Sequence, residues 1–181
     1  MNIPNYISLF RILLIPFFFT ELLTYTPDRP QHRTIALILF VIAALSDALD
    51  GMIARLSRSK TSLGRFLDPL ADKLLLLSGF LGILFVHALP YRPPLWITVT
   101  IVFRDVIIVG GMIVIFLSTG NIRIQPNLLG KFTTAFQMFT IMAILLEWQW
   151  SFIFWNVTAV LTIASCVVYC YRELNTMKPQ A

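Results

Sequence analysis

The stretch that decides the fold runs from Glu147 to Arg172 and reads EWQWSFIFWNVTAVLTIASCVVYCYR. None of the 24 residues between these two ends is charged. A helix that crosses the hydrocarbon core of a bilayer needs about 20 mostly apolar residues. The stretch is therefore long enough to cross a membrane as a single helix.

The rest of the chain has the same character. Of its 181 residues, 57% are hydrophobic and only 13% are charged, whereas about 25% are charged in a typical soluble domain. A soluble fold of this composition would have too few polar residues to cover its surface, and a disordered chain would need the opposite composition. The sequence therefore predicts an integral membrane protein. Its apolar residues come in runs, without the alternation of a transmembrane β-barrel.

Six apolar segments are long enough to cross the bilayer, so we expect an all-α protein with six transmembrane helices. They cover residues 6–23, 34–57, 68–88, 95–118, 131–147 and 152–171. We expect the first segment to remain as a span, because Arg11 lies inside it and no basic region precedes it as in a signal peptide. No repeat or low-complexity tract divides the chain, which we take as one membrane domain over residues 1–181.

The basic residues predict the orientation in the membrane. With an even number of spans both termini share one side, where ten of the 14 lysines and arginines fall, Arg11 among them. Arg29, Arg33 and Arg92 fall on the other side, and Arg104 lies inside the fourth span. Because cytoplasmic loops are rich in Lys and Arg, we expect cytoplasmic termini in a protein of the cytoplasmic (inner) membrane. Such a face also favours anionic lipid headgroups and phosphate ligands, and we expect no nucleic acid partner.

Acidic residues gather where the second and third predicted helices meet. Residues 46–55 read SDALDGMIAR and residues 64–73 read GRFLDPLADK. These two stretches hold four of the nine acidic residues, namely Asp47, Asp50, Asp68 and Asp72. On a helix, the first two share a face with Gly51, Ala54 and Arg55, and the last two lie one turn apart.

A short link between antiparallel helices would bring the two acidic faces together near the cytoplasmic end. Four carboxylates cannot stay ionised side by side at low dielectric without a cation. Oxygen ligands with no His or Cys nearby select Mg²⁺, Mn²⁺ or Ca²⁺. The sequence therefore predicts a two-metal site that binds a diphosphate. One alternative is that Asp68, which precedes Pro69, merely caps a helix.

The spacing D-x₂-D-G-x₂-A-R-x₈-G-x₃-D-x₃-D, from Asp47 to Asp72, resembles the signature of the CDP-alcohol phosphatidyltransferase family. The resemblance implies transfer of a phosphatidyl group from CDP-diacylglycerol to an alcohol, with release of CMP. It implies that Mg²⁺ or Mn²⁺ binds to the four aspartates and that Asp72 also acts as the general base. The CDP-lipid pocket would be lined by Asn5, Ser8, Gly51, Ala54, Arg55 and Gly64. The family also commonly forms homodimers.

Other motifs concern the acceptor alcohol. Residues 2–5 (NIPN) and the stretch from Leu129 to Gln137 resemble phosphatidylglycerophosphate synthases, a branch of this family that uses glycerol 3-phosphate. Arg104 and Lys131 would then bind the acceptor phosphate. Two simpler interpretations stay open, since Arg104 could form an internal ion pair with Asp105 or the acidic cluster, and Lys131 could be an interfacial anchor.

Asp105 departs from the Arg-Glu pair that is usual in that branch. An Arg-Asp pair resembles cardiolipin synthases of the same family, whose acceptor is phosphatidylglycerol. A function of a different class, a divalent-cation or proton-coupled transporter, is disfavoured because the acids concentrate at one membrane face and no inverted repeat is visible.

Among the smaller residues, we expect Gly79, Gly82 and the Gly110–Gly111 pair to permit close helix contacts or a bend.

Overall fold

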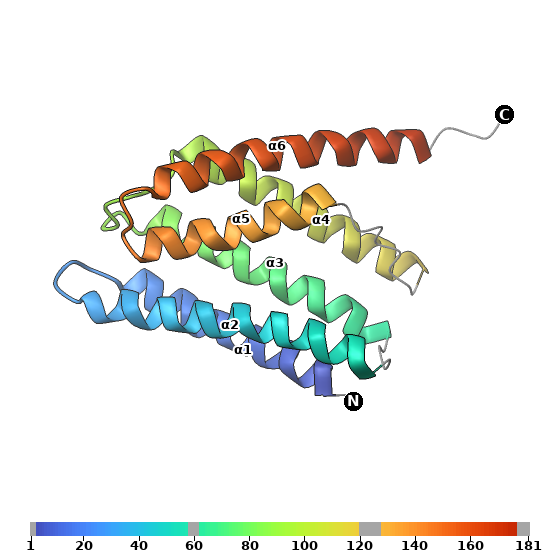
Figure 1. Ribbon diagram of the computed structural model, residues 1–181, viewed down its shortest axis with the longest axis horizontal. Helices are drawn as coiled ribbons and strands as arrows, with labels where there is room; N and C mark the ends of the chain where they lie inside the picture. Colours follow the sequence, from blue (N-terminus) through green and yellow to red (C-terminus); the bar gives the residue numbers. More distant parts are fainter. Residues whose placement is uncertain (1–2, 58–61, 120–127, 177–181) are drawn as a thin grey trace.

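A computed structural model describes residues 3–57, 62–119 and 128–176. For the helix residues 3–5, 47–57, 62–66, 112, 115–116, 118–119, 128 and 169–176 it describes the backbone alone. The described part consists of six helices and contains no strand (Figure 1). They are α1 (Ile3–Thr24), α2 (Pro30–Ser57), α3 (Ser62–Phe85), α4 (Leu95–Thr119), α5 (Leu128–Leu145) and α6 (Ser151–Thr176). The prediction of an all-α protein with six helices is confirmed.

The main difference from the predicted boundaries is the start of α3. The helix begins at Ser62, so Asp68 and Pro69 lie inside it, and the interpretation of Asp68 as a helix cap is wrong. Pro69 cannot donate to the carbonyl four residues earlier, yet α3 continues through it, as α1 continues through Pro16. Membrane helices tolerate such prolines because neighbouring groups satisfy the freed carbonyl.

Two of the helices carry a described segment that is long and apolar enough to cross a membrane. These segments are Tyr6–Thr24 in α1 and Ser151–Val168 in α6. Many large apolar side chains on the outside of the bundle are exposed, including Phe17, Phe103 and Leu117 at 65%, 66% and 78% of their surface. Such a surface suits hydrocarbon rather than water, and it agrees with the composition. The chain is a membrane protein.

α3 occupies the middle of the bundle, where it contacts α1, α2, α4 and α5 (Figure 1). Its glycines make this packing close. A methyl group on Gly79 would lie 2.6 Å from Cδ1 of Ile141 in α5, and one on Gly82 would collide with Leu22 in α1. The predicted close contacts are confirmed at these two positions. Gly110 has open space around it, so no close contact explains that glycine.

The two ends of the bundle differ. The α1–α2, α3–α4 and α5–α6 connections lie at one end, and α1 begins and α6 ends at the opposite end (Figure 1). At the connection end, Glu147 has a left-handed backbone (φ 53°) just after α5. Its carboxylate accepts a hydrogen bond from Tyr25 (3.0 Å) and pairs with Arg33, so it joins the first and last connections. The four aspartates of the predicted metal site lie toward the opposite end, late in α2 and early in α3.

Candidate active site

The predicted acidic cluster comes from the last half of α2 and the first half of α3. Asp47 and Asp50 lie on α2, Asp68 and Asp72 lie on α3, and these two helices contact each other at the end of the bundle where α1 begins (Figure 1). The first two side chains lie outside the described part, as do those of Asn5, Gly51, Ala54, Arg55 and Gly64. The backbone is helical at all four aspartates, so Asp47 and Asp50 lie within one turn of each other on α2, as Asp68 and Asp72 do on α3.

Asp68 is joined to α1. The Ser8 hydroxyl donates to Asp68 Oδ1 at 2.5 Å, across 60 positions of sequence, and Ser8 itself is fully buried. Asp72 lies one turn further along α3 and is half-buried. The resemblance implies that Ser8 lines the pocket of the CDP-linked lipid, and this hydrogen bond also joins it to a predicted metal ligand. The hydroxyl thus holds one carboxylate oxygen of Asp68 in place.

The donor set fits a hard divalent cation. Within the side chains that the structure describes, no three His, Cys, Asp or Glu residues come together as a metal site, and two of the four predicted ligands are not among them. The described pair, Asp68 and Asp72, offers oxygen atoms only, which is the ligand type that Mg²⁺ and Mn²⁺ prefer. These residues would hold the cation together with Asp47 and Asp50.

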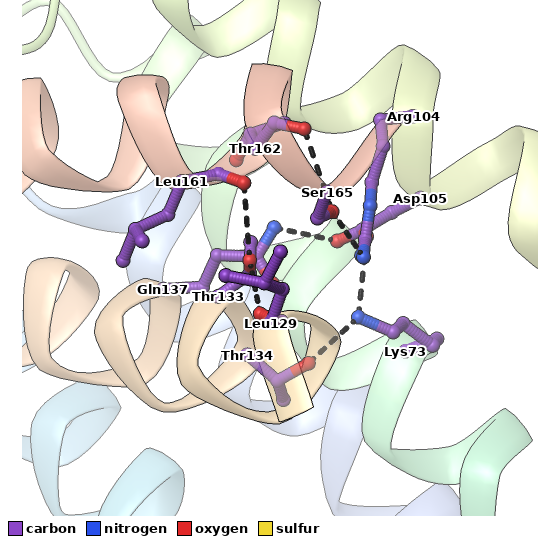
Figure 2. A network of polar contacts seen from close by, with 10 residues as sticks. All are labelled: Lys73, Arg104, Asp105, Leu129, Thr133, Thr134, Gln137, Leu161, Thr162 and Ser165. Carbon is purple, nitrogen blue, oxygen red and sulfur yellow. Dashed lines mark hydrogen bonds and ion pairs between the residues drawn. The ribbon is translucent and has the colours of Figure 1, made fainter. Parts of the chain in front are cut away.

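A second polar group lies buried between α3, α4, α5 and α6 (Figure 2). At its centre, Asp105 is 1% exposed. Its Oδ1 accepts from Arg104 Nη1 at 2.6 Å and from Lys73 Nζ at 3.2 Å, and its Oδ2 accepts from Gln137 Nε2 at 2.9 Å. The three helices α3, α4 and α5 are therefore joined by this one carboxylate as well as by apolar packing.

The partners of Asp105 have further contacts. Lys73 Nζ donates to Thr134 of α5 at 3.1 Å, and Arg104 Nη2 donates to Ser165 of α6 at 2.9 Å (Figure 2). Arg104 Nε and Gln137 Oε1 are buried atoms for which no hydrogen bond is found within the described ranges. Lys73, Arg104, Asp105, Thr134, Gln137 and Ser165 are called the buried network below.

The charges of the buried network do not cancel. Lys73 and Arg104 contribute two positive charges and Asp105 one negative charge, so one positive charge remains among these described residues. Both basic side chains are about nine-tenths buried, at 10% and 9% exposed. A buried charge without a counter-charge is costly. The network can therefore hold an anion such as a phosphate group.

The two residues predicted to bind the acceptor differ in exposure. Arg104 is buried and paired with Asp105, as the internal ion-pair interpretation holds, while Lys131 is exposed at the start of α5. Sequence reasoning missed Lys73 and Thr134 as partners of this site, although a lysine inside a predicted span was a usable signal. Arg11, counted among the cytoplasmic cations, is fully buried on α1.

A mainly apolar groove of about 350 Å³ reaches Arg104 from the outside of the bundle. It runs between α4 and α6 and is lined by Val99, Phe103 and Ile107 on one side and by Ile163 and Val167 on the other. These five side chains are exposed on the bundle surface. The groove thus connects the lipid-facing surface with the buried network.

The fold and the two polar groups define a helical membrane protein with an acidic, oxygen-donor site and a buried cationic site. Residues 1–169 match the sequence profile of the family described as CDP-alcohol phosphatidyltransferase. The chain belongs to the CDP-alcohol phosphatidyltransferase family. It is an enzyme, a transferase of substituted phosphate groups, and the transporter alternative is dropped.

Named relatives come from two branches. The chain is 37% identical over 155 residues to the CDP-diacylglycerol--glycerol-3-phosphate 3-phosphatidyltransferase of Bacillus subtilis, covering 81% of this chain and 77% of the relative. It is 32% identical over 170 residues to the cardiolipin synthase (CMP-forming) of Streptomyces coelicolor, covering 87% and 77%. It is 30% identical over 201 residues to a probable cardiolipin synthase (CMP-forming) of Drosophila melanogaster, covering 98% of this chain and 59% of the relative.

Proposed function

We propose that the protein transfers the phosphatidyl group of CDP-diacylglycerol to glycerol 3-phosphate, which releases CMP and forms phosphatidylglycerophosphate. The observation that carries the proposal is the excess positive charge of the buried network, where Lys73 and Arg104 share only Asp105 among the described residues. This charge favours an acceptor that carries a phosphate, as glycerol 3-phosphate and phosphatidylglycerol both do, over an alcohol without one. The name of the Bacillus subtilis relative, and the resemblance of residues 2–5 and 129–137, point to glycerol 3-phosphate.

The aspartates of α2 and α3 are proposed to carry the chemistry. An acceptor hydroxyl oxygen attacks the phosphorus of the phosphatidyl group, the bond from this phosphorus to the CMP oxygen breaks, and Asp72 accepts the hydroxyl proton. Bound Mg²⁺ or Mn²⁺, at a site for two cations, would neutralise the diphosphate charge. Asp68, whose carboxylate accepts from Ser8 at 2.5 Å, would serve as a ligand with Asp47, Asp50 and Asp72.

Two substrates would meet between these polar groups. Lys73 follows Asp72 directly on α3, so the proposed base and the proposed phosphate site lie on consecutive residues of one helix. Asn5, Gly51, Ala54, Arg55 and Gly64 are proposed to line the pocket of the CDP-linked lipid, and Ser8 supports it through Asp68. Lys131, exposed at the start of α5, is proposed to attract the acceptor rather than to bind it in the interior.

We further propose a single membrane domain over residues 1–181, with six transmembrane helices and both termini in the cytoplasm. The distribution of Lys and Arg over the loops supports this orientation. In the cytoplasmic (inner) membrane, the acidic end of α2 and α3 would then face the cytoplasm, where a nucleotide stays in water while the lipid chains of CDP-diacylglycerol remain in the bilayer. A homodimer stays a prediction.

An acceptor panel tests the proposal. Purified protein with Mg²⁺ or Mn²⁺ and CDP-diacylglycerol is offered glycerol 3-phosphate, phosphatidylglycerol, inositol phosphate or serine, and CMP release is measured. We expect release with glycerol 3-phosphate and the appearance of phosphatidylglycerophosphate by mass spectrometry. The variant Asp72→Asn is the control for release that does not depend on the site. No CMP with any acceptor would contradict the enzyme proposal.

A second candidate uses phosphatidylglycerol as acceptor and forms cardiolipin. Its specific support is the groove between α4 and α6, since apolar side chains such as Phe103 and Ile163 could hold an acyl chain beside Arg104. The Arg104–Asp105 pair and the names of the Streptomyces and Drosophila relatives agree with it. CMP release with phosphatidylglycerol alone would favour this candidate and reject glycerol 3-phosphate.

A further inference from the structure

A separate cavity lies at the connection end of the bundle, far along α3 from Asp68. It has a volume of about 510 Å³ and lies where α3 ends and α4 begins. Its lining includes apolar side chains, Leu84 and Leu95 among them, and polar ones, His87, Arg92 and Thr98, but no acidic residue. This α3–α4 cavity takes no part in the proposed reaction.

The polar lining is suited to an anion. Arg92 is exposed and forms no ion pair with another described residue. His87 Nδ1 donates to the Phe85 carbonyl at 2.9 Å, so Nε2 of the neutral ring can only accept a hydrogen bond, and the donors for an anion must come from other residues of the lining. No other hydrogen bond of the His87 ring is found within the described ranges. The Arg92 guanidinium is the strongest hydrogen-bond donor in the lining of the cavity.

A buried threonine also belongs to the lining. Thr98 is 1% exposed, and no hydrogen bond of its hydroxyl is found within the described part of the chain. Its backbone N–H and that of Ile97 already donate to the Pro94 carbonyl. The hydroxyl thus remains a donor inside the cavity, close to the positive end of the 25-residue helix α4.

The other half of the lining indicates a lipid. The walls contributed by Ile83, Leu84, Leu89 and Leu95 are apolar. Leu95 is 63% exposed, and Trp96, the next residue of α4, is 58% exposed. Exposed tryptophan at the start of a membrane helix is typical of the level of lipid headgroups. Inorganic phosphate would leave these walls unused, whereas an acyl chain would cover them.

We propose that the α3–α4 cavity binds an anionic glycerophospholipid. Its phosphate would contact Arg92 and the Thr98 hydroxyl, and the first part of an acyl chain would lie on Leu84 and Leu95. This site would be a second lipid site. With the acidic end of α2 and α3 at the cytoplasmic leaflet, the cavity lies at the other leaflet. It does not depend on the identity of the acceptor alcohol.

Native mass spectrometry of the purified full chain in detergent tests this site. Dioleoylphosphatidylglycerol and dioleoylphosphatidylcholine are titrated without CDP-diacylglycerol or divalent cation, so the outcome is independent of turnover. We expect Arg92→Gln to weaken the binding of one phosphatidylglycerol molecule by about tenfold or more, as for a lost charge-assisted hydrogen bond. Thr98→Val, which keeps the shape, should weaken it by about fivefold.

The matched control is Arg29→Gln, which removes an exposed cation from the same end of the bundle. It should leave phosphatidylglycerol binding within about twofold of the unmodified protein, as expected for a distant surface charge. Equal binding by Arg92→Gln and the unmodified protein would overturn the proposal. So would equal losses in the two arginine variants, equal binding of phosphatidylcholine, or displacement of the lipid by millimolar inorganic phosphate.

Discussion

The carboxylate of Asp105 accepts hydrogen bonds from Lys73, Arg104 and Gln137 in the interior of the bundle. Asp105→Asn keeps the size of the side chain but removes the only negative charge of the buried network. At an effective dielectric constant of about 20, the attractions lost at 2.6 Å to Arg104 and 3.2 Å to Lys73 are about 6 and 5 kcal/mol. Desolvation offsets much of this gross attraction, and breaking a buried pair usually costs about 3–5 kcal/mol net.

The free energy of unfolding should therefore fall by about 3–5 kcal/mol in Asp105→Asn. It can be measured by titrating the protein from mild detergent into dodecyl sulfate, with helicity as the signal. Glu147→Gln is the matched control, because Glu147 also accepts from two groups but its side chain is 32% exposed. Because a partly exposed pair of this kind contributes about 0–1 kcal/mol to stability, Glu147→Gln should lower the free energy of unfolding by no more than this.

A double variant isolates the charge. Lys73→Met in the Asp105→Asn background removes one of the two unbalanced cations, so part of the lost stability should return. The coupling between the two substitutions should reach about 1–3 kcal/mol. If the free energy of unfolding of Asp105→Asn lies within about 0.5 kcal/mol of that of the unmodified protein, the prediction from buried charge is refuted. A difference of that size is usual for an ordinary surface substitution.

Three further predictions concern the site and the packing. Asp72→Asn should abolish CMP release while CDP-diacylglycerol still binds, measured by equilibrium dialysis, and retained turnover would remove Asp72 as the base. Ser8→Ala should raise the Mg²⁺ concentration needed for half-maximal turnover by about fivefold, because Asp68 loses a hydrogen bond; an unchanged requirement would separate Ser8 from the metal site. Gly82→Ala should be about 1–3 kcal/mol less stable than Gly110→Ala in dodecyl sulfate titration, because only the first added methyl group meets a packed side chain; equal stabilities would contradict the close contact.

Much of the fold could be predicted from the sequence because each helix is a long apolar run. The clearest error concerns α3, which begins at Ser62 rather than at residue 68. Pro69 was taken as a sign of the first turn, since proline is common there. A proline inside a membrane helix gives the same local signal, and only the surrounding helices decide between the two cases.

The site was predictable where spacing along one helix determines it. Asp68 and Asp72 lie one turn apart on α3, as the four-residue interval requires. The contact of Ser8 with Asp68 joins residues 60 positions apart, and the contact of Lys73 with Asp105 joins residues 32 positions apart. Such contacts depend on how the helices pack, so spacing along the chain could not show them.

The most direct test of the account is the KM for glycerol 3-phosphate in Arg104→Gln and Lys131→Gln. If the buried network binds the acceptor phosphate, Arg104→Gln raises this KM by about tenfold or more, while the KM for CDP-diacylglycerol stays within about twofold, since the two substrates use different residues. Lys131→Gln, which removes an exposed charge, should change the KM for glycerol 3-phosphate by no more than about threefold. An unchanged KM for glycerol 3-phosphate in Arg104→Gln, or a larger rise in Lys131→Gln than in Arg104→Gln, would contradict the claim that the buried network binds the acceptor phosphate.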